Sequence, residues 1–193
     1  MRIVLVEDSQ IIRMDCRQML ELAGFEVVGE GSDGIDAINL CKALQPDVIL
    51  MDIEMPNLNG ISAAKQIIAE RPTQAIVFLT AYFEDALIQE AMQLGAFGYL
   101  VKPLDEKTLI STIRVAHAKS VKDRDLEKKL SELSQRLEDR RAIERAKGIL
   151  MKRNGIDEDT AYRLLRTLSM EKHCSIRRLS DLLLLSEDTG DIR

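Results

Sequence analysis

The sequence predicts an α/β fold with a parallel sheet in its first 118 residues, followed by an all-helical second part. Short apolar runs alternate with helical patterns five times over residues 1–118, and this alternation is typical of a parallel sheet with helices on both faces. Residues 3–6 and 48–51 are wholly apolar, as expected for strands buried on both sides. Beyond residue 118 the strand pattern stops and no proline occurs, which favours long helices.

The elements of the first part follow one another at short intervals. We expect strands at residues 3–6, 25–28, 48–51, 75–79 and 99–101, and helices at residues 9–22, 34–44, 61–70, 84–94 and 106–118. Gly24, Pro46, Pro72 and Gly95 each come directly after a predicted helix or one residue later. Glycine and proline end helices, so these positions support the predicted boundaries.

The second part begins with a predicted helix that runs to about residue 153. Leucines recur along it at helical spacing, at Leu126, Leu130, Leu133 and Leu137. Such a stripe indicates either pairing with another helix or packing against its own domain, and the spacing leaves both readings open. Gly155 follows this helix, Asp157 can cap a second helix that reaches residue 170, and a third helix is expected at residues 175–185.

The composition excludes secreted and membrane-spanning classes of protein. Charged residues make up 31% of the chain, and the net charge is −5. No apolar stretch approaches the roughly 20 residues that span a bilayer, and the apolar run at the N-terminus is too short for a secretory signal. Cys16, Cys41 and Cys174 are scattered, as is typical of reduced thiols. We therefore expect a cytoplasmic protein that does not associate with membranes.

Four of the predicted strands end in polar residues that stand out from the apolar runs before them. Glu7 and Asp8 come after the first strand, Asp52 after the third, Thr80 after the fourth and Lys102 after the fifth. In an open α/β sheet the carboxyl ends of the strands share one edge, and ligands bind there. We therefore expect these five residues to converge, although they are far apart in the sequence.

The convergent carboxylates predict a magnesium site. Crowded carboxylates repel one another unless a divalent cation neutralises them, and Mg²⁺ prefers oxygen ligands. We expect Asp8, Asp52 and the backbone carbonyl of Glu54 to bind Mg²⁺, with Glu7 binding it directly or through water.

The same edge predicts phosphoryl chemistry on Asp52. A carboxylate can attack a phosphoryl group and form an acyl phosphate. Lys102 would offset the charge on the transferring oxygens, and Thr80 would donate a hydrogen bond to them. Pro103, which follows Lys102, would hold the loop in shape, and the sequence leaves its peptide isomer open.

Specific motifs carry a resemblance to a known family. The motifs are Val-Glu-Asp at 6–8, Met-Asp-Ile-Glu-Met-Pro at 51–56 with Gly60, Thr-Ala at 80–81 and Tyr-Leu-Val-Lys-Pro at 99–103. Over residues 1–118 the chain resembles the receiver domain of two-component response regulators. The resemblance implies a flavodoxin-like, five-stranded parallel sheet of order 2-1-3-4-5, dependence on Mg²⁺ and a sensor histidine kinase as the phosphoryl donor.

Tyr99 has two possible roles. On a short strand its ring can simply pack as half-buried aromatic surface. The resemblance to receiver domains implies instead that Thr80 moves toward the phosphoryl group and that the ring of Tyr99 turns inward. We favour this second role, in which Tyr99 is part of the switch.

The second part is basic, in contrast to the first. Residues 1–118 carry a net charge of −8 and residues 119–193 a net charge of +3, and residues 136–178 hold 12 Lys and Arg against 7 Asp and Glu. Such a cluster either neutralises phosphates or forms solvated helix faces with internal salt bridges. Gly148 inside the long helix costs roughly 1 kcal/mol against alanine, so it calls for a close packing partner or a close approach to the backbone.

A second resemblance covers residues 135–185. Ile-Glu-Arg-Ala-Lys-Gly-Ile-Leu-Met at 143–151, Asp-Thr-Ala-Tyr-Arg-Leu-Leu-Arg at 159–166 and the segment 175–184 resemble the ANTAR output domain. This resemblance implies a three-helix RNA-binding domain that acts in transcription antitermination, and within that family the whole chain looks most like the antiterminators of ethanolamine-utilisation operons. We expect Arg145, Lys147, Lys152 and Arg166 to face phosphates or splayed loop bases, as RNA recognition typically requires.

Together these observations predict a receiver domain at residues 1–118, a helical or coiled-coil linker at 119–137 and an ANTAR domain at 138–187. Phosphorylation of Asp52 would favour a homodimer through the leucine stripe, and the output domains would then bind RNA hairpins in a nascent transcript and cause antitermination. We expect no catalysis beyond the receiver's own phosphorylation and dephosphorylation.

Two alternatives compete with this prediction. One is a DNA-binding response regulator, although little chain follows residue 185 for a recognition helix. The other is a phosphoryl-relay or partner-binding protein whose second part serves only for dimerisation.

Overall fold

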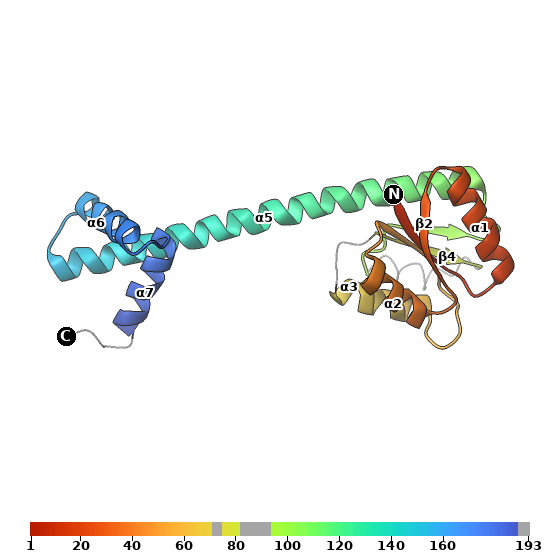
Figure 1. Ribbon diagram of the computed structural model, residues 1–193, viewed down its shortest axis with the longest axis horizontal. Helices are drawn as coiled ribbons and strands as arrows, with labels where there is room; N and C mark the ends of the chain where they lie inside the picture. The colour runs from red at the N-terminus through yellow and green to blue at the C-terminus, as the bar shows by residue number, and fades with distance from the viewer. Residues whose placement is uncertain (71–74, 82–93, 189–193) are drawn as a thin grey trace. The chain divides into compact units, whose positions relative to one another are not determined.

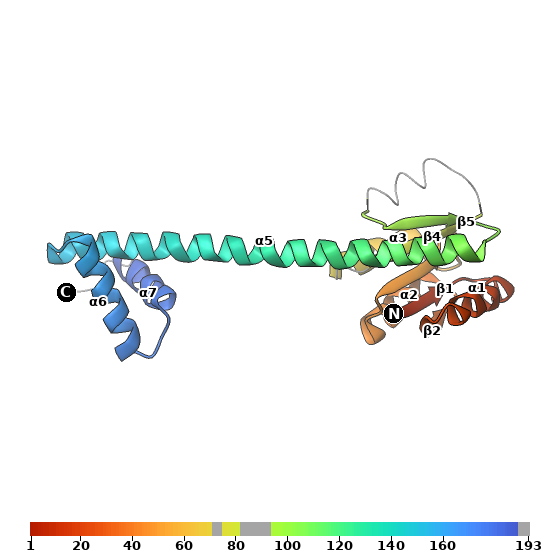
Figure 2. The same ribbon diagram turned by 90° about the horizontal axis from the view of Figure 1, so that it is seen from above.

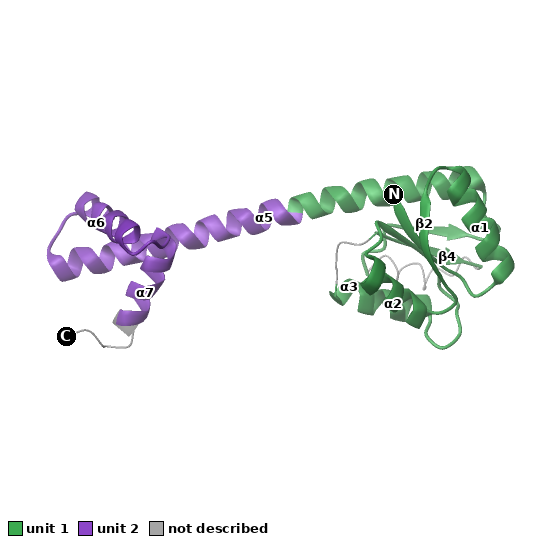
Figure 3. Cartoon of the chain, in the orientation of Figure 1, with its two compact units in different colours: residues 1–126 green, residues 127–193 purple. Residues whose placement is uncertain are grey.

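The computed structural model describes residues 1–70, 75–81 and 94–188 of the 193-residue chain. The chain divides into two compact units, Met1–Leu126 and Glu127–Arg193 (Figure 3). The first unit is called the receiver unit below and the second the helical unit.

Five parallel strands form one sheet in the order β2-β1-β3-β4-β5, which confirms the predicted order. The strands are β1 (Arg2–Val6), β2 (Glu26–Gly31), β3 (Val48–Asp52), β4 (Ala75–Thr80) and β5 (Gly98–Val101). Both β3 and β4 are buried along their whole length, which explains why their sequences do not alternate between apolar and polar residues. The strand order reverses direction between β1 and β3, and ligands bind at the carboxyl edge of such a point.

Helices cover both faces of this sheet (Figure 1). The helices α2 (Gly34–Leu44) and α3 (Gly60–Glu70) pack with Val4 and Val6 in one apolar core. On the other face, α1 (Gln10–Leu22) and the first turns of α5 (Glu106–Asn154) pack with Ile3 and Leu5. Because neighbouring residues of a strand point to opposite faces, β1 is held from both sides, and so is the position of its carboxyl end.

The helix that was expected to end at residue 118 continues as α5 to Asn154 without a break. Residues 106–147 contain neither proline nor glycine, so nothing in this stretch ends a helix. Ser120 is fully buried, which shows that packing within the receiver unit continues beyond residue 118. The division between the two units falls between Leu126 and Glu127, and the predicted linker of residues 119–137 is therefore part of one long helix.

The described residues of the helical unit form three helices: the last turns of α5, α6 (Glu158–Glu171) and α7 (Ile176–Asp188) (Figure 2). Ala146 and Leu150 of α5 pack against Ala161 and Leu165 of α6 in a small apolar core, and residues of α7 pack against it. The predicted cap is present, because the side chain of Asp157 accepts a hydrogen bond from the backbone N–H of Thr160 at 2.8 Å. The packing of α5, α6 and α7 around one core confirms the predicted three-helix arrangement.

The remaining differences from the predicted elements are small. The strand expected at residues 25–28 begins at Glu26 and extends to Gly31, and the helix expected to end at residue 185 reaches Asp188. Most of the helix expected at residues 84–94 lies outside the described residues. Within the described part of the chain, no helix has the length and apolar character needed to cross a membrane.

Candidate phosphoryl-acceptor site and nucleic-acid interface

The residues predicted to converge lie at the carboxyl ends of neighbouring strands. Glu7 follows β1 and Asp52 ends β3, while Thr80 ends β4 and Lys102 follows β5. Backbone hydrogen bonds tie these strand ends together. The N–H of Lys102 donates to the carbonyl oxygen of Thr80 at 2.8 Å, and the N–H of Glu7 donates to that of Gly31 at 3.1 Å.

Three carboxylates form the centre of this site. Glu7, Asp8 and Asp52 each place a carboxylate oxygen within 4.8 Å of the others. Glu7 and Asp52 are buried, whereas Asp8 is exposed. Buried like charges at this separation repel each other strongly, so the site requires a compensating cation.

Lys102 supplies part of that compensation. Its Nζ atom lies 2.7 Å from Oε2 of Glu7 and 2.7 Å from Oδ2 of Asp52. Burial lowers the pKa of Lys102, but the hydrogen bonds to Asp52 and Glu7 outweigh it and the pKa is raised. Burial raises the pKa of Glu7, and the charge of Asp52 acts in the same direction. The ammonium group is therefore kept charged between the two carboxylates.

The donor set also fits a divalent cation. Two buried carboxylates and one exposed carboxylate offer only oxygen ligands, the kind that Mg²⁺ prefers. Asp8, Asp52 and Glu7 are the side chains that would hold such an ion, and the ion would add positive charge where a phosphoryl group is transferred. The backbone N–H of Glu54 lies 3.4 Å from Oδ1 of Asp52, and the role of its carbonyl group as a ligand stays a prediction.

The loop between β3 and α3 is tied to the start of α2 by contacts that the sequence did not reveal. Asn57, at a φ of 62°, donates from Nδ2 to Oδ2 of Asp33 at 2.8 Å. The N–H of Gly34 donates to the carbonyl oxygen of Leu58 at 2.9 Å. A Cβ at Gly60 would collide with the backbone carbonyl oxygen of Asp52, so glycine is required there. The contact between Asp33 and Asn57 joins residues that are far apart in the sequence, and no local pattern predicts it.

Two further predicted residues occupy β4 and β5. Thr80 is buried at the carboxyl end of β4, the strand next to β3. Tyr99 lies on β5, the edge strand, and is 38% exposed. The peptide bond between Lys102 and Pro103, whose isomer the sequence left open, is cis.

The basic residues predicted to contact RNA separate into two groups. Arg145, Lys152 and Arg166 are exposed on the helical unit. Lys147 is only 7% exposed, and its Nζ lies 2.9 Å from Oε1 of Glu144 and 2.6 Å from Oε1 of Glu158. Hydrogen bonds to Glu158 and Glu144 raise the pKa of Lys147. Lys147 thus joins α5 to the first turn of α6, and its contact with RNA stays a prediction.

The leucine stripe of α5 is exposed along its length. Leu126, Leu130, Leu133 and Leu137 are between 54% and 66% exposed. The spacing left open whether the stripe pairs with another helix or packs against its own domain. Among the described residues, the stripe does not pack against its own domain.

A parallel sheet of this order, with three carboxylates and a lysine at its carboxyl edge, defines a receiver-type phosphoryl-acceptor domain. The comparisons agree: residues 3–114 match the family model of the response regulator receiver domain, and residues 131–184 match that of the ANTAR domain. The chain belongs to the response regulator family and carries an ANTAR output domain.

Relatives match both the whole chain and the receiver unit. The transcriptional regulatory protein PdtaR of Mycobacterium tuberculosis is 37% identical over 183 residues, which cover 95% of this chain and 89% of PdtaR. The chemotaxis protein CheY of Thermotoga maritima is 35% identical over 112 residues, or 58% of this chain and 93% of CheY. Among solved structures, the receiver domain of NarL from Mycobacterium tuberculosis has a TM-score of 0.59 at 30% identity, covering 61% of this chain and 95% of that one. These similarities support a role in transcription regulation.

Proposed function

We propose that this chain is a phosphorylation-activated regulator that binds RNA hairpins through its ANTAR domain and causes transcription antitermination. The observation that carries the proposal is a complete acceptor site, with Asp52 buried between Lys102 and two further carboxylates, in one chain with an ANTAR domain. A regulator with an inactive receiver would not need to keep buried, mutually repelling carboxylates.

Phosphorylation begins at the carboxylate of Asp52. One of its oxygens forms a bond to the phosphorus atom of a histidine kinase's phosphohistidine while the P–N bond breaks, and the electron pair of that bond stays on the imidazole. Lys102 holds the attacking carboxylate in place and offsets negative charge on the phosphoryl oxygens. Mg²⁺ bound at Glu7, Asp8 and Asp52 would supply further positive charge there. In this proposal the receiver acts only on its own Asp52 and has no other substrate.

Dimerisation through the exposed leucine stripe would follow phosphorylation. The stripe offers apolar side chains at coiled-coil spacing that nothing in the described chain covers. Two ANTAR domains on one dimer would raise the effective concentration of the second domain when the first has bound a transcript with two hairpins. Antitermination would result because RNA held by the dimer cannot fold into a terminator.

A binding titration tests the proposal. The full chain, phosphorylated with a small phosphoryl donor, is titrated against hairpin RNA, hairpin DNA of the same sequence and duplex DNA. We expect preference for hairpin RNA and at least tenfold weaker binding by Asp52→Asn, together with terminator read-through in a purified transcription system. Preference for duplex DNA would favour a DNA-binding regulator, and the absence of nucleic-acid binding would favour a relay or partner-binding protein.

A further inference from the structure

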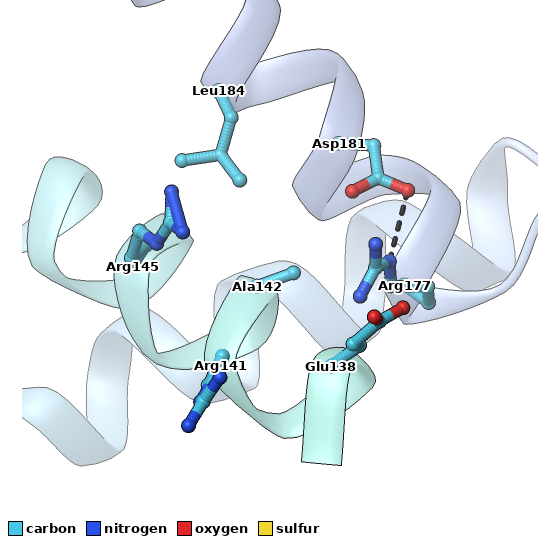
Figure 4. Close-up of a pocket in the computed structure, with 7 residues that line it drawn as sticks. All are labelled: Glu138, Arg141, Ala142, Arg145, Arg177, Asp181 and Leu184. Carbon is cyan, nitrogen blue, oxygen red and sulfur yellow. Dashed lines mark hydrogen bonds and ion pairs between the residues drawn. The ribbon is translucent and has the colours of Figure 1, made fainter. Parts of the chain in front are cut away.

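The helical unit contains a pocket of about 370 Å³ between α5 and α7 (Figure 4). Its lining comprises Glu138, Arg141, Ala142 and Arg145 of α5 with Arg177, Asp181 and Leu184 of α7. The lining residues of α5 follow the spacing i, i+3, i+4, i+7 and those of α7 the spacing i, i+4, i+7, so each set shares one helix face. This volume falls in the range of pockets that hold small ligands.

Two arginines at this pocket carry charge that the protein does not neutralise. Among the described residues, the side chains of Arg141 and Arg145 form no ion pair or hydrogen bond with another side chain, and both are exposed. The side chain of Arg145 points toward Leu184, whereas that of Arg141 points away from it (Figure 4). Arg141 and Arg145 lie one helical turn apart on α5, and a guanidinium group binds phosphate oxygens through paired N–H donors.

The third arginine is held in a fixed position inside the pocket. Arg177 donates from Nε to Oδ2 of Asp181 at 2.9 Å, and its Nη1 lies 3.5 Å from Oδ1 of Asp139. Nη1 is buried and has no hydrogen-bond partner with adequate geometry in the part of the chain that the structure describes. A ligand acceptor that reached Nη1 would satisfy this donor, since a buried unsatisfied N–H is costly.

The rest of the lining restricts what the pocket accepts. Glu138 and Asp181 bring carboxylate oxygens, which repel a plain anion but accept hydrogen bonds from N–H groups. Ala142 and Leu184 add apolar surface. An occupant that joins a negative group to a partly apolar part with N–H donors would complement this lining, and a nucleotide combines these features.

We propose that this pocket binds one unpaired nucleotide of an RNA loop, with its phosphate on Arg141 and Arg145 and an amino or imino group of its base on Glu138 or Asp181. Unpaired loop bases are the part of RNA that proteins read in a sequence-specific way, and they stack on arginine planes. The inference rests on the proposed function, because it locates a contact for the RNA that the ANTAR domain is proposed to bind. It assigns roles to Glu138 and Asp181 that the sequence did not indicate.

The test uses the phosphorylated full chain and a pool of RNA hairpins with a constant stem and a randomised loop. A hairpin selected by the wild type serves as the probe for all variants. We expect Arg141→Ala and Arg145→Ala each to weaken binding about tenfold, since each removes charged hydrogen bonds. Each variant should also bind with a weaker dependence on salt. The slope of log K against log salt concentration should become less steep by about 0.7 for each phosphate that the variant no longer neutralises. The matched control is Arg140→Ala, which removes an exposed arginine beside the pocket lining and should bind as the wild type does.

A second variant tests whether RNA binding requires the open volume of the pocket. Leu184→Trp keeps every charge but fills the pocket, and Leu184 is not part of the small apolar core. We expect binding to weaken about tenfold with an unchanged melting temperature of the free protein. Selection from the pool by Glu138→Gln and Asp181→Asn should yield a different base preference at one loop position.

The possible results separate the two proposals. If the wild type binds no hairpin of the pool, the proposed function fails and the inference fails with it. If the wild type binds but the arginine and Leu184 variants bind equally well, the pocket inference alone is overturned. If the arginine variants weaken binding while both carboxylate variants select the wild-type loop, the site holds a phosphate without reading a base, and the nucleotide inference is overturned.

Discussion

At the scale of single residues, Lys102 is the lysine that neutralises two buried carboxylates of the receiver unit. Its one ammonium group contacts both Glu7 and Asp52 at 2.7 Å, and both carboxylates are buried. Removing one partner from a buried charge group leaves the others uncompensated, which costs more than the pair itself contributes. Lys102 therefore supports both the chemistry of the site and the stability of the folded unit.

Lys102→Ala should lower the rate of phosphorylation of Asp52 by a small donor about 100-fold. In EDTA we also expect the free energy of unfolding to fall by about 3 kcal/mol. Added Mg²⁺ should recover part of this loss, because the ion takes over the compensation of Glu7 and Asp52. Denaturant titrations with and without Mg²⁺ measure the effect, and Lys107→Ala, at an exposed lysine, is the control. A loss of stability that Mg²⁺ leaves unchanged would contradict cation binding at these carboxylates.

Cys16 should be inert to thiol reagents in the folded protein. Burial, and to a smaller degree the charge of Glu7, raises the pKa of the Cys16 thiol to about 12. A raised pKa favours the neutral thiol, and only the thiolate is the nucleophile, so about one molecule in 10,000 is reactive at pH 8. Cys41 is also buried, whereas Cys174 is partly exposed.

A disulfide reagent at pH 8 measures this difference. It should modify one thiol quickly in the native chain and all three cysteines after denaturation. In Cys174→Ser no thiol should react quickly, and a fast reaction in that variant would contradict the prediction.

At the scale of elements, the strands and the site were predictable because each depends on local sequence. A run such as residues 48–51 is apolar because both faces of β3 are covered, and the residue after such a run lies at the functional edge. Lys147 was not predictable in the same way, since its burial depends on Glu158 of the next helix. The contact between Asn57 and Asp33 likewise joins residues 24 positions apart. Such contacts depend on how elements pack against one another, and the hydrophobic periodicity of one element does not predict them.

Gly148→Ala should stabilise the free helical unit by about 1 kcal/mol. A Cβ at Gly148 would meet no other group within 4 Å, so the packing reason that the sequence suggested is absent from the described chain. The other reason that the sequence suggested is close approach to the backbone. Under the proposed function RNA would make that approach, so we expect the same variant to bind hairpin RNA more weakly.

Gly155→Ala is the matched control, since Gly155 has a φ of +63° and alanine is strained there. It should destabilise the unit by about 1 kcal/mol or more. Denaturant titration and an RNA titration of both variants provide the measurements. Stabilisation by Gly148→Ala with unchanged RNA binding would exclude the approach of RNA at this position.

At the scale of the whole molecule, two units with separate cores share one continuous helix, α5. The receiver unit contains the acceptor site, and the helical unit contains its own small apolar core and the pocket between α5 and α7. Between the residues of α5 that belong to these cores lies the leucine stripe. Oligomeric state is thus the property of the whole chain that this stripe should control.

Leu130→Glu combined with Leu133→Glu should abolish the dimer of the phosphorylated chain without changing the rate at which Asp52 is phosphorylated. The reason is that both leucines are more than half exposed on α5, where charge at the seam of a coiled coil opposes pairing. Light scattering of the phosphorylated chain measures the mass. Ser131→Glu changes an exposed neighbour and should leave the dimer intact, and a dimer of unchanged mass in the double variant would place the interface elsewhere.

The exposure of α5 also determines how its backbone amides exchange with solvent deuterium. Leu109, Ile113 and Ala116 are buried near one end of the helix, and Ala146 and Leu150 near the other. Between them, nearly every residue from 121 to 141 is exposed, and helical segments without tertiary packing are marginally stable in water. The amides of this middle segment should therefore exchange quickly in a monomer and slowly in a dimer. Their deuterium uptake would report the state of Asp52 from a part of the chain that takes no part in its chemistry.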